Sequence, residues 1–243
     1  MTLQEAMEYR SSVRRYTDAP IEEPTVKALK KIITHYNRRS GLSFKWIEDG
    51  SAAFSSFLHT MGRFKGVRSL IALKGNKDAE NLYEKIGRYG ERIVLEAVSL
   101  GLGTCWVSGS FDRNCVALST SEDEELVAVI TVGYPVPDTK PEIFQKIQPL
   151  LHRKIPLKKM YICDSPPADW FMQGIGAARN APSGGNRQPV RFFYMNGVVL
   201  ASVRNIDSPP LVDLGIAKSH FELAVPGKFD YGNGGLFTKR KDT

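Results

Sequence analysis

The spacing of apolar residues predicts a first set of helices and strands between residues 22 and 135. An apolar residue recurs every three or four positions over 22–38, as in a helix with one buried face (Val26, Leu29, Ile33, Tyr36). Residues 42–48 alternate between apolar and polar, which is typical of a strand. The apolar runs at 67–75 and 126–135 indicate two buried strands.

A longer helix is predicted from residue 82, in the stretch LYEKIGRYGERIVLEAVSLGLG. Its apolar residues share one face (Tyr89, Ile93, Ala97 and Leu100, widened by Val94 and Val98). Arg92, Glu96 and Ser99 lie on the opposite face. Gly101 or Gly103 can end the helix in the left-handed conformation. The pattern therefore predicts a well-buried helix.

A second set of elements follows from about residue 165. Residues 169–180 and 211–224 have helical spacing, the latter with one apolar side (Leu214, Ala217, Phe221, Ala224). The segments 190–196 and 198–203 predict a hairpin, because Asn196-Gly197 is a strong turn dipeptide. The proline- and lysine-rich stretch 135–160 indicates a connector with one short helix at 142–147. The glycine-rich, basic tail from residue 227 is expected to be partly ordered at most.

Both sets run helix, strand, strand, helix, and this order indicates an α+β fold with a degenerate internal repeat. The alternative is that unrelated α+β proteins share such strings of elements, since element order alone carries little information.

Composition places the chain among globular proteins. It has 243 residues, 42% hydrophobic and 24% charged, enough for one large domain or two small ones. No stretch approaches twenty apolar residues, and the first residues lack the apolar core of a signal peptide, so we expect a cytoplasmic protein without a membrane span. Three cysteines and four scattered histidines do not have the spacing of a metal site.

The formal net charge of +7 leaves two interpretations open. A basic surface can collect the phosphates of a nucleic acid, or it can surround a pocket for an anionic small molecule. The chain has no helix-turn-helix, zinc-finger or RNA-binding pattern, which favours the small molecule over nucleic acid.

Two basic stretches are candidates for binding an anion. The first has two arginine forks and two hydroxyls within five residues (Arg10, Ser11, Ser12, Arg14). The second, LLHRKIPL, offers Arg153 and Lys154. Taken singly, the first stretch is more typical of a helix end with solvated arginines, and the second of a basic linker.

Two glycine-rich stretches are candidates for binding a flat ligand. In GLGTCWVSGSFD, residues 101–112, the glycines allow the backbone to approach a ring closely, although a helix cap with a core Trp106 is the simpler reading. In APSGGNRQPV, residues 181–190, exposed N–H groups and the Asn and Gln side chains offer both donors and acceptors. The alternative there is an ordinary glycine-rich turn.

Four motifs together resemble the FMN-dependent nitroreductase family. They are RSSVRRYTDAPI, GERIVLEAVSLGLGTCWVSG, VGYP and APSGGNRQPV, and they span residues 10 to 190. The resemblance implies an α+β flavoprotein that takes electrons from NADH or NADPH. It passes them to nitroaromatics, quinones or similar small-molecule acceptors.

The order of the motifs departs from ordinary family members, in which the A-P-S loop follows the arginine motif closely. Here the corresponding place reads THYNRRSGLSFKW, and the loop stands in the second part, which lacks an R-S-x-R motif. Ordinary members are homodimers in which each FMN lies between subunits. The chain therefore resembles a smaller group of internally duplicated members, in which two protomers are fused as a pseudo-dimer. This implies halves at 1–160 and 161–243, a monomer and one FMN per chain.

By this resemblance, residues of both halves hold the cofactor. Arg10, Ser11, Ser12 and Arg14 bind its phosphate and ribityl end with help from Arg153 or Lys154, and the second half contributes the loop (Pro182, Ser183, Asn186, Gln188). The backbone from Trp106 to Gly109 follows the isoalloxazine, with the Ser108 N–H as candidate donor to flavin N5. No side chain need be catalytic, because the flavin carries the hydride chemistry. A flavin store or sensor with little turnover, and a flavin-consuming or dehalogenating activity, are the alternatives.

Overall fold

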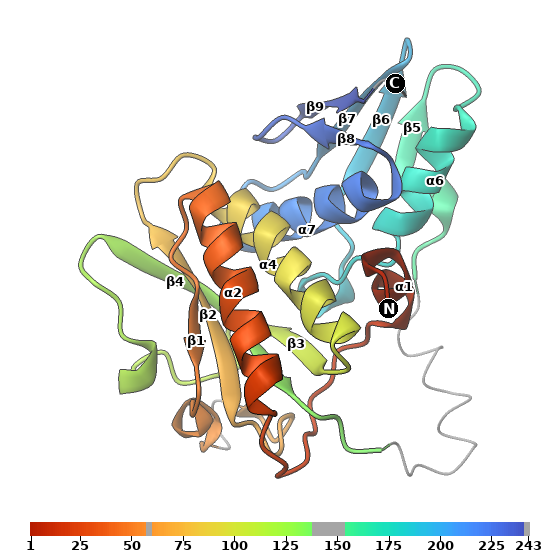
Figure 1. Cartoon of the computed structure of the whole chain (residues 1–243). Coiled ribbons are helices and arrows are strands. Elements are labelled where there is room, and N and C mark those ends of the chain that lie inside the picture. The colour runs from red at the N-terminus through yellow and green to blue at the C-terminus, as the bar shows by residue number, and fades with distance from the viewer. Residues whose placement is uncertain (57–59, 138–153, 241–243) are drawn as a thin grey trace.

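The computed structural model describes residues 1–56, 60–137 and 154–240. Its strands form two β-sheets (Figure 1). The first sheet has the order β1-β2-β4-β3 (β1 Lys45–Ile47, β2 Ser69–Asn76, β3 Gly103–Val107, β4 Glu124–Gly133). The second has the order β5-β6-β7-β9-β8 (β5 Tyr161–Cys163, β6 Arg191–Met195, β7 Val198–Ser202, β8 Gly227–Phe229, β9 Gly235–Lys239). This mixture of helices and separate sheets confirms the predicted α+β class.

The two sheets share one pattern of strands and helices. The run β6-β7-β9-β8 repeats β1-β2-β4-β3, and every neighbouring pair in both runs is antiparallel. In each run a helix precedes the first strand (α2 Glu23–Ser40, α6 Asp169–Ala178). A second helix lies between the second and third strands in sequence (α4 Leu82–Ser99, α7 Ser208–Ala224). Strand β5 is an addition, paired in parallel with the edge of β6.

Helices α4 and α7 cross at the centre of the molecule, between the two sheets (Figure 1). Two glycines permit the close contact. A Cβ on Gly87 would lie 2.0 Å from the carbonyl oxygen of Val212, and a Cβ on Gly215 would lie 2.0 Å from that of Glu84. Val212 stands three residues before Gly215, and Glu84 stands three residues before Gly87. The two glycines therefore make equivalent contacts with the opposite helix.

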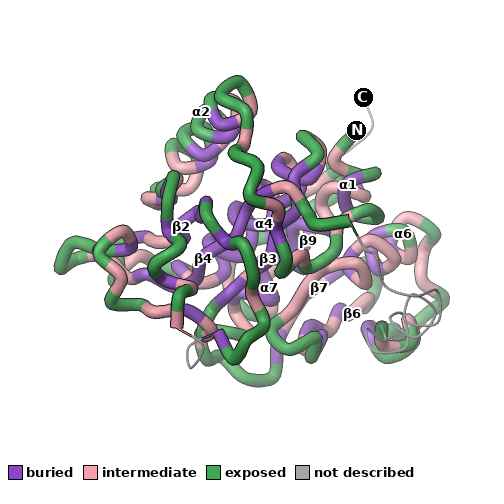
Figure 2. The backbone as a smooth tube through the Cα atoms, turned by 90° about the horizontal axis from the view of Figure 1, so that it is seen from below, coloured by how far each residue is buried: buried purple, intermediate pink, exposed green. Residues whose placement is uncertain are grey.

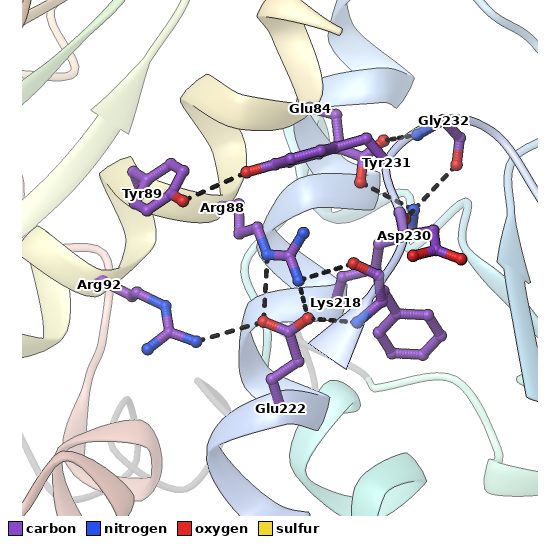
Figure 3. Close-up of polar contacts among 10 residues, drawn as sticks. Glu84, Arg88, Tyr89, Arg92, Lys218, Glu222, Asp230, Tyr231 and Gly232 are labelled. Atoms are coloured by element: carbon purple, nitrogen blue, oxygen red, sulfur yellow. Dashed lines mark hydrogen bonds and ion pairs between the residues drawn. The ribbon is translucent and has the colours of Figure 1, made fainter. Parts of the chain in front are cut away.

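Buried charges also pair across this helix crossing (Figure 3). The ammonium of Lys218, fully buried on α7, lies 2.7 Å from a Glu84 carboxylate oxygen on α4. Glu222 of α7 binds the guanidinium groups of Arg88 and Arg92 on α4. Removing one member of such a pair leaves an uncompensated buried charge, which costs about 3–5 kcal/mol.

One apolar cluster joins the two sets of elements. The buried residues around α4 and the first sheet form a cluster that also contains Val212 and Ile216 of α7. A second cluster, rich in phenylalanine, lies between α6, α7 and the second sheet. Figure 2 shows the buried backbone concentrated along α4, α7 and the adjoining strands. One face of the first sheet therefore packs against α4, and one face of the second sheet packs against α7.

Several predicted elements differ from the observed ones. The tail forms the β8–β9 hairpin up to residue 239, because β9 pairs with β7 and buries Phe229 and Phe237. Residues 103–107 form a strand rather than a loop. Leu100 is 40% exposed, since the helix ends at Ser99 and Gly101 has a φ of 84°. The predicted helix at 142–147 lies outside the described residues.

The described helices include none that combines the length and the apolar character needed to cross a membrane.

We expect Gly215→Ala to lower the free energy of unfolding by about 1–3 kcal/mol, because its Cβ would meet a helix backbone that cannot move aside. The control is Gly176→Ala within α6, whose Cβ would have no neighbour within 4 Å. That change should stabilise the protein by about 0.4–1 kcal/mol, since it restricts the unfolded chain. Urea denaturation of both variants checks this, and equal midpoints would contradict the close helix contact.

Candidate functional site

Arg10 occupies a mostly buried position directly after helix α1 (Leu3–Tyr9). The helix begins at Thr2, whose hydroxyl accepts from the Glu5 N–H while the Glu5 carboxylate accepts from the Thr2 N–H. The Arg10 side chain is 11% exposed. Its Nε is buried and has no hydrogen-bond partner among the described residues. The nearest carboxylate oxygen, Glu91 Oε1, lies 3.9 Å from this Nε, too far for a hydrogen bond. A buried donor without an acceptor is costly, so this guanidinium is suited to an incoming anion.

Two further cations gather beside Arg10. Burial lowers the pKa of Lys154, and the positive charges of Arg179 and Arg10 lower it further. The nearby carboxylate of Glu8 opposes this effect on the pKa. Arg179 also donates from Nε to the Ile155 carbonyl at 3.0 Å. Three like charges from distant parts of the chain therefore converge, as they do in sites for phosphate or carboxylate.

The rest of the arginine motif runs along β3. The Val13 N–H donates to the Thr104 carbonyl at 2.9 Å, and Ser12 forms a parallel bridge with Thr104. Burial raises the pKa of the Cys105 thiol, while the charges of Arg14 and Arg10 and hydrogen bonds from Ser12 and Arg14 lower it. Ser11, Ser12 and Arg14 are exposed. The structure thus places these polar groups beside the strand that leads to Trp106.

Trp106 lies at the end of β3 with its indole against helix α4. A Cβ on Gly90 would lie 2.6 Å from the indole ring, so the glycine provides the space for it. The indole N–H donates to Glu91 Oε2 at 2.8 Å. The half-buried side chain is therefore turned toward α4.

Ser108 and Gly109 follow β3 and are both exposed. The guanidinium of Arg113 donates to the Ser108 carbonyl at 2.7 Å and to the Leu126 carbonyl at 2.6 Å. These bonds fasten the turn to β4. Ser108 stands four residues after Thr104, about 13 Å along the strand direction. A ligand that reaches from the Arg10 region to this turn must therefore be elongated.

The loop at 182–189 is held by bonds among its own residues. The Gln188 N–H donates to Ser183 Oγ at 2.9 Å, and its amide nitrogen donates to Asn186 Oδ1 at 3.0 Å. Gly185, Asn186 and Gln188 have positive φ angles of 58°, 56° and 47°. Such angles are unfavourable for a non-glycine residue, so the surrounding bonds must hold them in place.

This loop is joined to the basic cluster through Lys154 and Ile155. Gln188 Oε1 accepts from the Ile155 N–H at 3.1 Å, and the Lys154 ammonium contacts the Asn180 side-chain oxygen. The predicted site residues Arg10, Lys154 and Gln188 are thus connected in space, although they are far apart in sequence. Arg153 lies outside the described residues.

Asp213 on α7 supports the same loop from inside. Its carboxylate accepts from the Gly184 N–H at 3.0 Å. Burial raises its pKa to about 6, while the Gly184 N–H and Arg187 oppose the rise. Asp213 also lines, with Pro182, Ser183 and Gln188, a cavity of about 20 Å³. That volume holds no more than a water molecule, so a larger ligand would have to lie on the outer side of the loop.

Four residues of this region were not predicted from the sequence patterns: Arg179, Asp213, Glu91 and His220. Glu91 and His220 are fully buried, and their side chains lie 2.8 Å apart. Glu91 follows Arg88 by three residues and His220 follows Asp213 by seven, so polar residues that share one helix face are the signal that could have indicated them. Arg179 stands three residues before the loop, but only the fold shows that it approaches Lys154.

A sequence model of the family described as "Putative TM nitroreductase" matches residues 2–225. Among solved structures, one described as a putative nitroreductase from Thermotoga maritima is 22% identical with a TM-score of 0.64, covering 98% of this chain and 92% of its own. A putative nitroreductase from Desulfovibrio desulfuricans in complex with FMN is 17% identical with a TM-score of 0.51, covering 69% of this chain and 99% of its own. No curated protein sequence matches. The fold is therefore nitroreductase-like.

Asp213 predicts a pH dependence of stability. Its pKa is raised from 3.8 to about 6 by folding, so the folded state binds more protons between these values. Stability should therefore fall as the pH rises from about 4 to about 6, by up to roughly 3 kcal/mol. Asp213→Asn should remove this part of the slope. Urea denaturation across that pH range measures it, and parallel curves for both proteins would refute the assignment.

Proposed function

Because the chain belongs to this nitroreductase family, we propose that it is an FMN-dependent oxidoreductase that uses NADH or NADPH. Its acceptors are nitroaromatics, quinones or similar small molecules. The observation that carries the proposal is the convergence of Arg10, Lys154 and Arg179, with the Arg10 Nε buried and lacking a hydrogen-bond partner in the described part of the chain. The similar structure from Desulfovibrio desulfuricans, which contains FMN, supports the same cofactor.

The residues present fit the phosphate end of FMN. A phosphate brings two negative charges and three acceptor oxygens to a cluster of three cations. Arginine forks suit its oxygens, and the hydroxyls of Ser11 and Ser12 add donors. The serines are exposed beside the motif, where a ligand can reach them. Arg14 completes this group through its place beside β3.

The ring end of the cofactor would meet backbone rather than side chains. The turn at Ser108 and Gly109 is exposed and fastened by Arg113, so its N–H groups keep a fixed direction. We assign the Ser108 N–H as donor to flavin N5. Bound FMN supplies the hydride transfer, while the chain supplies position and electrostatics. The loop with Ser183, Asn186 and Gln188 contributes polar groups from the second half.

We further propose that residues 1–160 and 161–243 act as two fused protomers. The repeated strand order and the reciprocal contact of Gly87 with Gly215 support an internal two-fold relation. The arginine motif belongs to the first half and the A-P-S loop to the second, so one chain would provide one complete site. On this proposal the protein works as a monomer with a single FMN.

The proposed function predicts a yellow protein that retains one FMN per chain and oxidises NADH or NADPH when a quinone is present. Arg10→Gln should weaken FMN binding roughly ten- to a hundredfold, because it removes a charged hydrogen bond. Riboflavin, which lacks the phosphate, should be affected less. Fluorescence titration with both flavins measures the difference.

The control is Arg38→Ala, which removes an equal charge from an exposed position on α2. It should leave both affinities unchanged. Equal losses of FMN and riboflavin in Arg10→Gln would reject the phosphate site. FMN binding without any oxidation of NADH or NADPH would instead point to a flavin store or sensor.

The fused-protomer proposal predicts that sites do not form between chains. Arg10→Gln and Arg179→Gln place one defect in each half, and the two variants can be unfolded and refolded together. If sites formed between subunits of a dimer, about a quarter would regain both arginines. If each site lies within one chain, mixing restores no tight FMN binding. Light scattering at twice the chain mass, with recovered binding, would defeat the proposal.

A further inference from the structure

Glu91 is a fully buried carboxylate on the inner face of α4, and both of its oxygens are engaged. Oε1 lies 2.8 Å from His220 Nε2 and 3.9 Å from Arg10 Nε. Oε2 accepts from the indole N–H of Trp106 at 2.8 Å. A fully buried carboxylate needs compensating partners, and Glu91 has two hydrogen bonds, with His220 and Trp106, and a longer charge–charge contact with Arg10.

These three groups come from three separate segments of the chain. Arg10 follows α1, Trp106 lies on β3, and His220 belongs to α7 of the second half. The His220 ring is itself fully buried, and its other nitrogen lies 3.2 Å from the Ala177 carbonyl on α6. Glu91 therefore joins the arginine motif, the strand before the Ser108 turn and the second half at one point.

Other buried carboxylates of the helix crossing have different partners. Glu84 binds Lys218 and the Gly232 N–H, and Glu222 binds Arg88 and the Phe229 N–H. Glu91 differs from these because two of its neighbours, Arg10 and Trp106, belong to the predicted flavin site.

A carboxylate at position 91 suits its neighbours better than an amide of the same shape would. A carboxylate offers two acceptor oxygens and no donor. An amide of the same shape offers one acceptor and one donor, so a glutamine here must turn its NH₂ toward either the indole N–H or the histidine. It also loses the charge that attracts Arg10. A glutamine would therefore fit the space and still disturb the arrangement.

We propose that Glu91 is a positioning residue of the flavin site. It holds the Arg10 guanidinium and the Trp106 indole at a fixed separation and anchors both to His220. The phosphate cations and the Ser108 turn thereby keep the spacing that an elongated cofactor requires. This rests on the proposed function, since it assigns the two ends of the site to FMN.

The test compares Glu91→Gln with Glu84→Gln, which removes an equally buried α4 carboxylate that pairs with α7. We expect Glu91→Gln to weaken FMN binding about tenfold and riboflavin binding less, because Arg10 loses its orientation. The indole N–H signal of Trp106 should shift in a ¹H–¹⁵N spectrum, while that of Trp170 stays in place. Glu84→Gln should lower the unfolding midpoint without either effect.

Equal effects of the two variants on both flavins, or an unmoved Trp106 signal, would overturn the positioning role. Failure of the unmodified protein to bind FMN would instead reject the proposed function, so the two failures are distinguishable. If Glu91→Gln does not fold, His220→Gln serves as the second variant, because His220 reaches the site through Glu91. An unchanged ratio of FMN to riboflavin affinity in that variant would also overturn the proposal.

Discussion

The packing of α4 directly on α7 is the contact on which the rest of the structure depends. Gly87 and Gly215 bring the helix backbones together, and this proximity places acidic and basic side chains of one helix within reach of the other. Paired charges at such depth stabilise one register only, because a shift of one turn would leave each of them without its partner. The crossing therefore fixes how the two sheets are placed relative to each other.

That placement in turn gathers the basic cluster. Arg10 belongs to the first set of elements and Arg179 to the second, and neither segment could hold three like charges by itself. Bringing them together costs electrostatic energy in the absence of an anion. A ligand that neutralises them would bind to the folded state alone, so its binding energy would add to the stability of the fold.

The conformation of the loop at 182–189 likewise depends on contacts with other parts of the chain. Its positive φ angles at Asn186 and Gln188 are maintained by Ser183, Ile155 and Asp213, which come from three different places in the chain. Asp213 keeps its carboxylate at the Gly184 N–H although burial raises its pKa. Local strain is thus held by tertiary contacts, as is common where backbone groups face a ligand.

Sequence alone determined the local elements and the family. Helical spacing predicted α2, α4 and α7, the Asn196-Gly197 dipeptide predicted the β6–β7 hairpin, and four motifs indicated a nitroreductase-like flavoprotein. These features depend on neighbours within a few residues or on short recognisable strings. The prediction that the tail is partly ordered at most was wrong. The tail is ordered because it pairs with β7 and buries Phe237, which its own composition does not indicate. Only the tertiary structure decided that Arg179 approaches Lys154 and that Glu91 meets Arg10, Trp106 and His220. Contacts between such distant positions follow from the angle and register of two packed helices, and no local pattern of residues encodes that geometry.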